Sequence, residues 1–381
     1  LTQEEALDSI GKNFEILLLL MGMMMVVEIM SKSGIFQWLA IKVAQVAKGD
    51  PIKILILLSL VTSICSAFLD NVTTILLILP VSILLAKRLK INLMPFILVP
   101  IFACNIAGTA TMIGDPPNLI IASAGNLTFN NFLFHVAPIV IINLIVLIIT
   151  ALLLFRNDFN VSNELRASIM DLEPNRSITD KSLLIKSCVL FFIIILGFIT
   201  NIVTNIGLAI ISIGGSIILL LLSKKSAEEI YQKIEWETLF FFGGLFVLID
   251  GIGKIGIISI IGNTILNFTH GNVKLTSYVI LIISSIISPI LGSVPYTISF
   301  SKVIQEMTQS MNNAQILWWA LSLGACLGGN MTTIGAPANI VGISIAEKAD
   351  VKINFLEFFK YGFLVVLESI TLSFIYIYIR Y

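Results

Sequence analysis

The sequence predicts an all-α membrane protein built from two inverted repeats, each with spanning helices, a re-entrant hairpin and a broken helix. Three observations lead to this fold class. Hydrophobic residues make up 57% of the 381 residues, charged residues only 12%, and the mean hydropathy is +1.00. Several apolar stretches reach the roughly 20 residues that a spanning helix needs. Motifs of the first half also recur at a nearly constant spacing in the second.

Composition excludes a soluble globular protein. Soluble domains carry about 25% charged residues, so the bilayer is the expected solvent here. The net charge is zero, which gives no reason to expect a nucleic-acid partner. The four cysteines lie in apolar stretches without C-x-x-C spacing, which is typical of small packing residues. They are Cys65, Cys104, Cys188 and Cys326.

The apolar stretches fall into spans and shorter arms. Six stretches have the length of full spans, namely 14–31, 131–155, 182–203, 205–223, 238–252 and 355–379. Two shorter and partly amphipathic stretches, 34–47 and 255–268, suit helices that lie in the membrane interface.

Four further apolar stretches contain breaks. Two read as hairpins, 51–89 with a break at Asp70-Asn71 and 276–311 with a break at 292–295. The other two read as broken helices, 95–125 and 315–346. Their breaks are Gly-Asp-Pro-Pro-Asn at 114–118 and Gly-Ala-Pro-Ala-Asn at 335–339.

These breaks belong to an internal repeat. Glu15 in Phe-Glu-Ile-Leu and Glu237 in Trp-Glu-Thr-Leu are 222 positions apart, and the breaks at 114–118 and 335–339 are 221 apart. Three more pairs share the spacing of 222: Gly22 and Gly244, Glu28 and Asp250, and Gly34 and Gly256. Agreement within one residue over about 100 positions indicates a duplication.

The repeat sets the domain organisation. The second half carries two extra spans, 182–203 and 205–223, ahead of its match to Glu15. Their equivalents fall before residue 1, so we expect the first half to lack two leading helices. The predicted order is an N-terminal repeat at 1–155, a charged linker at 156–181 and a C-terminal inverted repeat at 182–381.

Positive charge predicts the orientation. With the halves inserted oppositely and the linker in the cytoplasm, eighteen of the 23 Lys and Arg residues lie inside. The five outside are Lys12, Lys254, Lys274, Lys302 and Arg380. An excess of Lys and Arg is typical of cytoplasmic loops. We therefore expect an integral protein of a prokaryotic plasma membrane with a cytoplasmic linker.

The breaks are the expected substrate and ion site. Broken helices at membrane depth must line protein or a watery cavity, and transporters bind ions and substrates there, between repeats. Gly and Pro free backbone carbonyls for a cation, and the resumed helices point their N-terminal amides at the centre, which favours an anion. The neutral candidates are Asn71, Thr73, Thr109, Thr111, Gly114, Asn118, Ser293, Thr297, Asn330, Thr332, Thr333, Gly335 and Asn339.

Asp70 and Asp115 are the two carboxylates at the breaks. A carboxylate inside the membrane is costly unless it is paired, protonated or bound to an ion. Each is either a helix cap or the carrier of a coupling H⁺ or Na⁺, and a sodium site would involve Asp70, Asn71 and Asp115. The second half has Gly292 and Ala336 at these places, so the ion site is expected to be asymmetric. No other metal and no organic cofactor is expected.

Other charged residues have structural interpretations first. Glu15 and Glu237 stand at helix starts, where they favour the helix dipole. Glu28 and Asp250 fall near the far interface, about 20 Å along each helix at 1.5 Å per residue. Glu368, in the middle of the last span, is read either as structural or as functional.

The motifs resemble the ion transporter superfamily. They are Ser-Ala-Phe-Leu-Asp-Asn-Val-Thr-Thr at 66–74, Ile-Gly-Asp-Pro-Pro-Asn at 113–118, Gly-Ala-Cys-Leu-Gly-Gly-Asn at 324–330, and Glu-Phe-Phe-Lys at 357–360. The nearest resemblance is to the arsenite-pump (ArsB) and melanosomal P-protein branch, with NhaD-type antiporters and citrate and dicarboxylate carriers more distant. It implies a scaffold with a mobile, elevator-type transport domain, a homodimer, and the site residues named above. Relatives in this branch usually show Asp-Asn where this chain has Gly292-Ser293.

Three classes of function remain open. The favoured one is a secondary transporter, and not an enzyme, that moves a small inorganic ion or oxyacid, arsenite-type or another anion, with H⁺ or Na⁺. No arginine lies at a break, which disfavours a large multivalent carboxylate. A sodium/proton antiporter is the alternative within this class, and a passive anion channel the alternative outside it. An intramembrane enzyme is disfavoured because the sequence has no H-E-x-x-H motif or other catalytic cluster.

Overall fold

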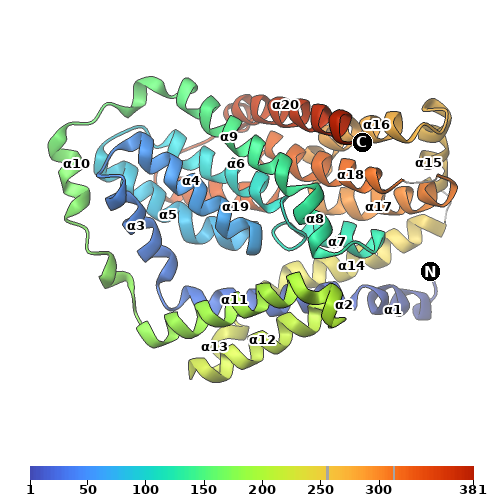
Figure 1. The fold of residues 1–381 in the computed structure, drawn as a ribbon, viewed down its shortest axis with the longest axis horizontal. Coiled ribbons are helices and arrows are strands. Elements are labelled where there is room, and N and C mark those ends of the chain that lie inside the picture. The colour runs from blue at the N-terminus through green and yellow to red at the C-terminus, as the bar shows by residue number, and fades with distance from the viewer. Residues whose placement is uncertain (255–256, 312–313) are drawn as a thin grey trace.

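The computed structural model describes residues 1–254, 257–311 and 314–381, and these residues form helices without any strand (Figure 1). Seven of the described helices are long and apolar enough to cross a membrane. The predicted all-α membrane class is confirmed. The inverted orientation of the halves stays a prediction.

The six predicted spans are present as helices. They are α2 (Phe14–Ser31), α9 (Ala137–Leu154), α11 (Lys181–Thr204), α12 (Leu208–Ser223), α14 (Trp236–Lys254) and α20 (Phe355–Arg380). Four of them, at 14–31, 137–154, 181–204 and 355–380, are among the seven that are long and apolar enough to cross. The other three of the seven, at 51–68, 71–89 and 273–291, belong to the predicted hairpins. The span predicted at 131–155 starts late because a separate helix, α8 (Phe129–His135), ends before it. Pro138 lies in the first turn of α9, where its missing N–H costs nothing but where it cannot continue a preceding helix.

The two arms and both hairpins lie where the sequence predicts them. The arms are α3 (Ile35–Val46) and α15 (Ile257–Phe268), and residues 255–256 of the second predicted arm, including Gly256, are outside the described residues. The hairpins are α4 (Pro51–Phe68) with α5 (Asn71–Leu89), and α16 (Val273–Leu291) with α17 (Ser293–Ser310). In Figure 1, α3 lies toward one end of the molecule and α15 toward the other.

The broken helices cross-pack with the hairpins. They are α6 (Met94–Gly108) with α7 (Pro116–Gly125), and α18 (Gln315–Gly328) with α19 (Pro337–Lys348), the second pair joined through a 3-10 turn at Gly329–Met331. The resumed helix α7 packs on α17, and α19 packs on α5. Each resumed helix therefore lies against the hairpin of the other half, which brings the breaks of both halves together.

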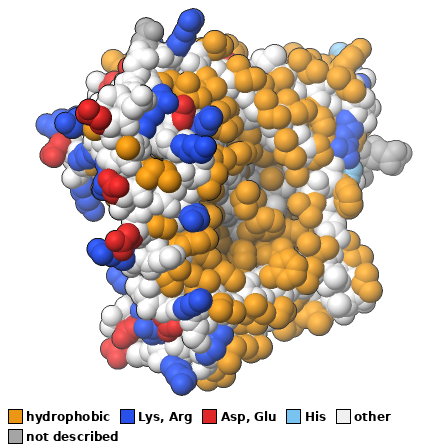
Figure 2. All heavy atoms as spheres, turned by 60° about the vertical axis from the view of Figure 1, so that its left-hand side comes forward, with side chains coloured by type: hydrophobic (Ala, Val, Ile, Leu, Met, Phe, Trp, Pro, Cys, Tyr) orange, Lys and Arg blue, Asp and Glu red, His pale blue; other side chains and the backbone are white. Residues whose placement is uncertain are grey.

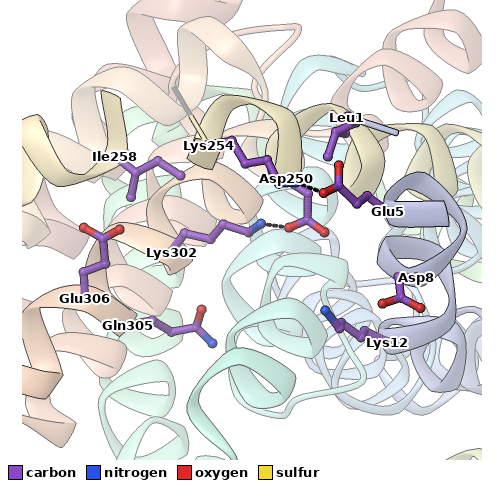
Figure 3. A pocket seen from close by; sticks show the side chains of 10 residues that line it. All are labelled: Leu1, Glu5, Asp8, Lys12, Asp250, Lys254, Ile258, Lys302, Gln305 and Glu306. Atoms are coloured by element: carbon purple, nitrogen blue, oxygen red, sulfur yellow. Dashed lines mark hydrogen bonds and ion pairs between the residues drawn. The ribbon is translucent and has the colours of Figure 1, made fainter. Parts of the chain in front are cut away.

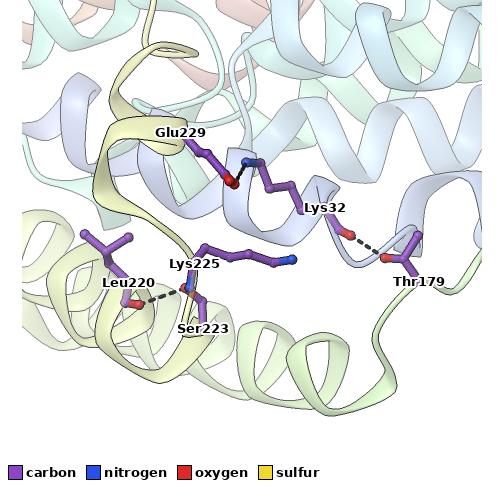
Figure 4. Close-up of polar contacts among 6 residues, drawn as sticks. All are labelled: Lys32, Thr179, Leu220, Ser223, Lys225 and Glu229. Atoms are coloured by element: carbon purple, nitrogen blue, oxygen red, sulfur yellow. Dashed lines mark hydrogen bonds and ion pairs between the residues drawn. The ribbon is translucent and has the colours of Figure 1, made fainter.

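The charged linker contains a helix, α10 (Asn163–Met170), and it is bonded to the first half. The Gln45 side chain of α3 donates to the carbonyl oxygen of Leu172 at 2.6 Å. The Thr179 hydroxyl of the linker donates to the backbone carbonyl of Lys32 (Figure 4). The side-chain ammonium of Lys32 pairs at 3.0 Å with Glu229 of α13 (Ala227–Tyr231). Lys32, directly after α2, thus contacts both the linker and the second half.

The molecular surface separates charge from apolar side chains. Large apolar residues are widely exposed, for example Val203 at 83%, Phe240 at 77% and Ile379 at 77%. Figure 2 shows Lys, Arg, Asp and Glu gathered at the end that carries the linker, beside a broad apolar and hollowed face. An apolar face of this size is typical of a lipid-facing surface.

Opposite insertion of the two halves predicts opposite labelling of two lysine positions. Lys87 ends α5 and Lys274 begins α16. A cysteine at Lys87 should react with a membrane-impermeant thiol reagent only from the cytoplasmic side, and one at Lys274 only from the outside. Labelling of intact cells and of inverted vesicles measures this. Reaction of both cysteines from the same side contradicts the inverted arrangement.

Candidate functional site

Asn118 holds the first break closed. It lies in the first turn of α7, and its side-chain nitrogen donates to the backbone carbonyls of Thr109 at 2.9 Å and Thr111 at 2.8 Å. These carbonyls have lost their helical partners because the chain leaves the α-helix after Gly108. A side-chain amide with two N–H groups can satisfy two such acceptors at once.

Asn339 does the same for the second break. Its side-chain nitrogen donates to the carbonyls of Gly329 at 2.8 Å and Thr332 at 2.7 Å. Asn118 and Asn339 are 221 positions apart and both are fully buried. The repeat found in the sequence therefore reappears as a repeated hydrogen-bond arrangement.

Two further contacts join each break to the other half. The oxygen of Asn118 accepts from the Ser322 hydroxyl of α18 at 2.7 Å. Asn105 of α6 donates to the side-chain oxygens of Asn330 at 2.8 Å and Asn339 at 2.7 Å. Both break asparagines thus use their two N–H groups on backbone carbonyls, and in this way they position the breaks.

Each hairpin tip is fastened to the break of its own half. Thr111 donates its hydroxyl to the carbonyl of Ala67, and Thr332 donates to the carbonyl of Pro289 at 2.6 Å. A second pair of bonds runs from Ser66 to the carbonyl of Cys104 and from Ser288 to the carbonyl of Ala325, at 2.6 and 2.7 Å. The Asn71 side-chain oxygen also lies within hydrogen-bond distance of the Ser66 hydroxyl, so the single Ser66 proton is shared between two acceptors. These bonds tie the tip to the break in each half.

Gly114 and Gly335 allow the backbone to close at the breaks. A Cβ at Gly114 would overlap the carbonyl oxygens of Ser66 and Gly108, and a Cβ at Gly335 would overlap that of Gly329. Backbone atoms cannot move aside as a flexible side chain can. Both predicted glycines therefore lie where a close backbone approach requires glycine.

A methyl group at Gly114 should destabilise the protein measurably. Gly114→Ala overpacks a buried site, a change that typically costs about 1–3 kcal/mol, so we expect a lower melting temperature in detergent and weaker transport. Gly214→Ala is the matched control, because nothing lies within 4 Å of a Cβ placed there. Equal melting temperatures for the two variants would contradict the close approach.

The two carboxylates differ in what they bind. Asp70 caps α5, where it accepts from the backbone N–H of Thr73 at 2.9 Å and from the Thr73 hydroxyl. Asp115 precedes α7, is 4% exposed and makes no capping bond to that helix. Asp70 therefore acts as a helix cap. Asp115 uses none of its carboxylate oxygens to cap its helix, so it has more lone pairs left to bind an ion.

The second hairpin tip has no carboxylate because its backbone takes another course. Gly292 has φ of +89°, in the region that favours glycine, whereas Asp70 has φ of −63°. The next residue, Ser293, donates its backbone N–H to the carbonyl of Gly335 at 3.1 Å. An aspartate at position 292 would be strained in this conformation.

Several candidate side chains make no bond that holds the site together. The hydroxyls of Ser293 and Thr297 are buried and have no partner in the described part of the chain. Thr109 donates to the carbonyl of Asn105 at 2.9 Å within its own helix. Thr333 is only partly buried beside the second break.

Two cavities flank the breaks at places related by the repeat. One, of about 300 Å³, has a lining that includes Asn13, Ile120, Asp250, Ile298, Ser301 and Lys302. The other, of about 610 Å³, has a lining that includes Val72, Leu76, Glu235, Thr238, Pro337 and Val341. Asn13 corresponds to Glu235 and Ile298 to Leu76 at a spacing of 222, so each half contributes an equivalent vestibule.

Glu235 gives the larger cavity an ionisable group just before α14. Burial, together with the nearby carboxylates of Asp70 and Glu237, raises the pKa of Glu235 to about 7. The Thr238 hydroxyl donates to it at 3.1 Å. Glu235 can therefore exchange a proton near neutral pH beside the first hairpin tip.

Asp250, Glu5 and Glu368 have protein partners. Asp250 pairs with Lys302, and Glu5 of α1 (Gln3–Lys12) pairs with Lys254 (Figure 3). Glu368 accepts from the Thr150 hydroxyl of α9 at 2.8 and 2.9 Å. This bond favours the structural interpretation of Glu368.

A family model described as citrate transporter (CitMHS) matches residues 1–324. The chain belongs to the citrate transporter family. A 46 kDa membrane protein of Mycobacterium leprae is 40% identical over 97% of this chain and 87% of its own length. An uncharacterized transporter of Mycobacterium tuberculosis is 38% identical over the same shares.

Two more distant similarities agree with this family. The P protein of Mus musculus is 30% identical over 97% of this chain and 54% of its own length, so the chain spans about half of that protein. The crystal structure of the Alcanivorax borkumensis YdaH transporter matches with a TM-score of 0.57 at 12% identity, over 96% of this chain and 85% of that one. The predicted superfamily is confirmed, and the fold is that of a membrane transporter.

Within this citrate transporter family member, sequence reasoning missed Asn105, Ser322 and Glu235. A signal for Asn105 was present, because an amide in the middle of the apolar run at 101–108 needs partners. Ser322 and Glu235 gave no such signal. Their role depends on contacts between helices that are far apart in the sequence.

Proposed function

We propose that this transporter moves a small inorganic anion or oxyacid, coupled to H⁺ or Na⁺, by an elevator-type movement of the two tip-and-break units against the rest of the molecule. The observation that carries the proposal is the pair of breaks ordered by Asn118 and Asn339, from which α7 and α19 resume with their N-termini at the centre. Helix N-termini favour anions, and the carboxylates of Asp70 and Asp115 favour a cation beside them.

The absence of arginine at the breaks disfavours large polycarboxylates as the transported solute. Bidentate Arg–carboxylate pairs are the usual strong way to hold such anions. The break segments contain neutral amides, hydroxyls and the two aspartates, without arginine. A small anion or a neutral oxyacid needs only these groups and a compensating cation. Citrate, named in the family description, is therefore one solute to test among several.

Solid-supported-membrane electrophysiology on proteoliposomes tests the proposal. Arsenite, phosphate, citrate, chloride and Na⁺ are applied in turn, with and without a pH or Na⁺ gradient. We expect a current with at least one small solute, and a response of that current to one of the gradients. Currents that ignore both gradients would favour a passive channel, and Na⁺ currents that need no second solute would favour a sodium/proton antiporter.

A further inference from the structure

Three buried hydroxyls follow one face of α17. The three are Ser293, Thr297 and Ser301, which follow one another at intervals of four residues. This spacing places side chains on the same side of a helix. They are 2%, 0% and 2% exposed. Within the described part of the chain, none of the three hydroxyls has a hydrogen-bond partner.

Such hydroxyls normally find a partner inside their own helix. Ser299, also on α17, donates to the carbonyl of Pro295 at 2.9 Å, and Thr62 of α4 donates to that of Leu58 at 2.7 Å. A buried polar group without a partner is unfavourable, and native proteins rarely leave one unmatched. Three in a row on one face indicate partners that come from outside the chain.

The hydroxyl face connects the candidate site with a cavity. Ser293 lies at the hairpin tip, bonded through its backbone to Gly335 of the second break. Ser301, eight residues and about 12 Å further along, lines the cavity of about 300 Å³ between α7, α14 and α17. Thr297 lies midway between them.

The equivalent face of α5 is apolar beyond its first residue. At a spacing of 222, Ser293, Thr297 and Ser301 correspond to Asn71, Ile75 and Leu79. Ile75 and Leu79 are fully buried. The duplicated fold therefore packs well with apolar side chains at these places, and packing does not require the hydroxyls of α17.

The cavity at the end of this face is polar, and its charges are balanced. Its charged side chains are Lys12, Asp250 and Lys302. Asp250 is paired with Lys302, and Lys12 lies beside Asp8, which lines the adjoining pocket (Figure 3). The hydroxyl donors along α17 therefore decide what suits this face, and they suit a solute that carries oxygen atoms.

We propose that the Ser293–Thr297–Ser301 face of α17 is a hydrated route along which a small oxygen-bearing solute passes between this cavity and the second break. The inference rests on the proposed transport function and adds to it the path of the solute. Water and the solute oxygens would supply the hydrogen bonds that the protein does not.

Cysteine labelling tests the route without any need for transport. Ser301→Cys should react with the anionic reagent MTSES at least ~10-fold faster than Val303→Cys, which replaces an equally buried residue on another face of α17. The parent chain with its four native cysteines is the blank. Equal rates at positions 301 and 303 would overturn the proposal.

A hydroxyl deletion gives the second measurement. Thr297→Val keeps the shape and removes the hydroxyl, so transport should fall several-fold while the melting temperature stays the same or rises. Thr297→Ser should restore transport. A lower melting temperature with unchanged transport would assign the hydroxyl to structure and refute the route. If the parent moves no solute but Ser301→Cys is still labelled as expected, the proposed function fails and the hydrated face stands.

Discussion

Alanine at Asn118 or Asn339 should lower transport on the order of 100-fold while the protein still inserts into the membrane. Each amide satisfies two carbonyls of its break. Leaving a buried polar group unpaired costs about 1–3 kcal/mol, and about 1.4 kcal/mol is a factor of ten. The broken geometry at the centre would relax, and uptake into proteoliposomes measures the loss.

Asn272→Ala provides the control for this experiment. Asn272 caps α16, where its side-chain oxygen accepts from the backbone N–H of Leu275 at 3.0 Å, at the end of that helix away from the breaks. Its replacement should leave transport near the parent rate. Parent-like uptake by both Asn118→Ala and Asn339→Ala would mean that the breaks are simple kinks.

Neutralising the coupling carboxylate should convert accumulation into exchange or leak. A charged carboxylate cannot cross the bilayer cheaply, so binding of H⁺ or Na⁺ would neutralise it and permit the elevator movement. Asp115→Asn mimics the neutral state at the residue with spare oxygen capacity. Asp70→Asn does so while it keeps the cap, because Asn caps helices as well as Asp. We expect at least one of them to lose concentrative uptake under an imposed gradient and to retain solute exchange.

Asp50→Asn is the control for this test, because it removes the charge of a capping aspartate that lies away from the breaks. Asp50 caps α4 through the backbone N–H of Lys53 at 3.1 Å, and it pairs with Arg166 of the linker at 3.4 Å, away from both breaks. It should accumulate solute like the parent. If Asp70→Asn and Asp115→Asn also accumulate like the parent, another group carries the coupling ion, and Glu235 is the next to test.

Much of the fold could be predicted because its signals are local. Apolar runs give the spans, and Gly and Pro give the breaks, since they change the backbone wherever they occur. Both hairpins, both broken helices and both arms lie at the predicted places. The separate helix α8 was missed because an apolar run hides a short break before Pro138.

The site could be predicted in its residues but not in its connections. Asn118 and Asn339 stood out as polar groups at symmetric breaks, yet their partners Ser322 and Asn105 come from the other half. Pairings of this kind depend on how helices pack, which no local pattern contains. The unpaired hydroxyl of Ser301 was invisible for the same reason, because only the tertiary structure distinguishes a buried serine with a partner from one without.

The central claim is that an ion gradient drives uphill solute transport through the paired breaks. The most direct measurement is accumulation of the solute that gives a current, in proteoliposomes with a pH or Na⁺ gradient, before and after an ionophore collapses that gradient. We predict that solute rises above its outside concentration and then drains when the ionophore is added. Equilibration to the outside concentration, with or without the gradient, would contradict ion coupling.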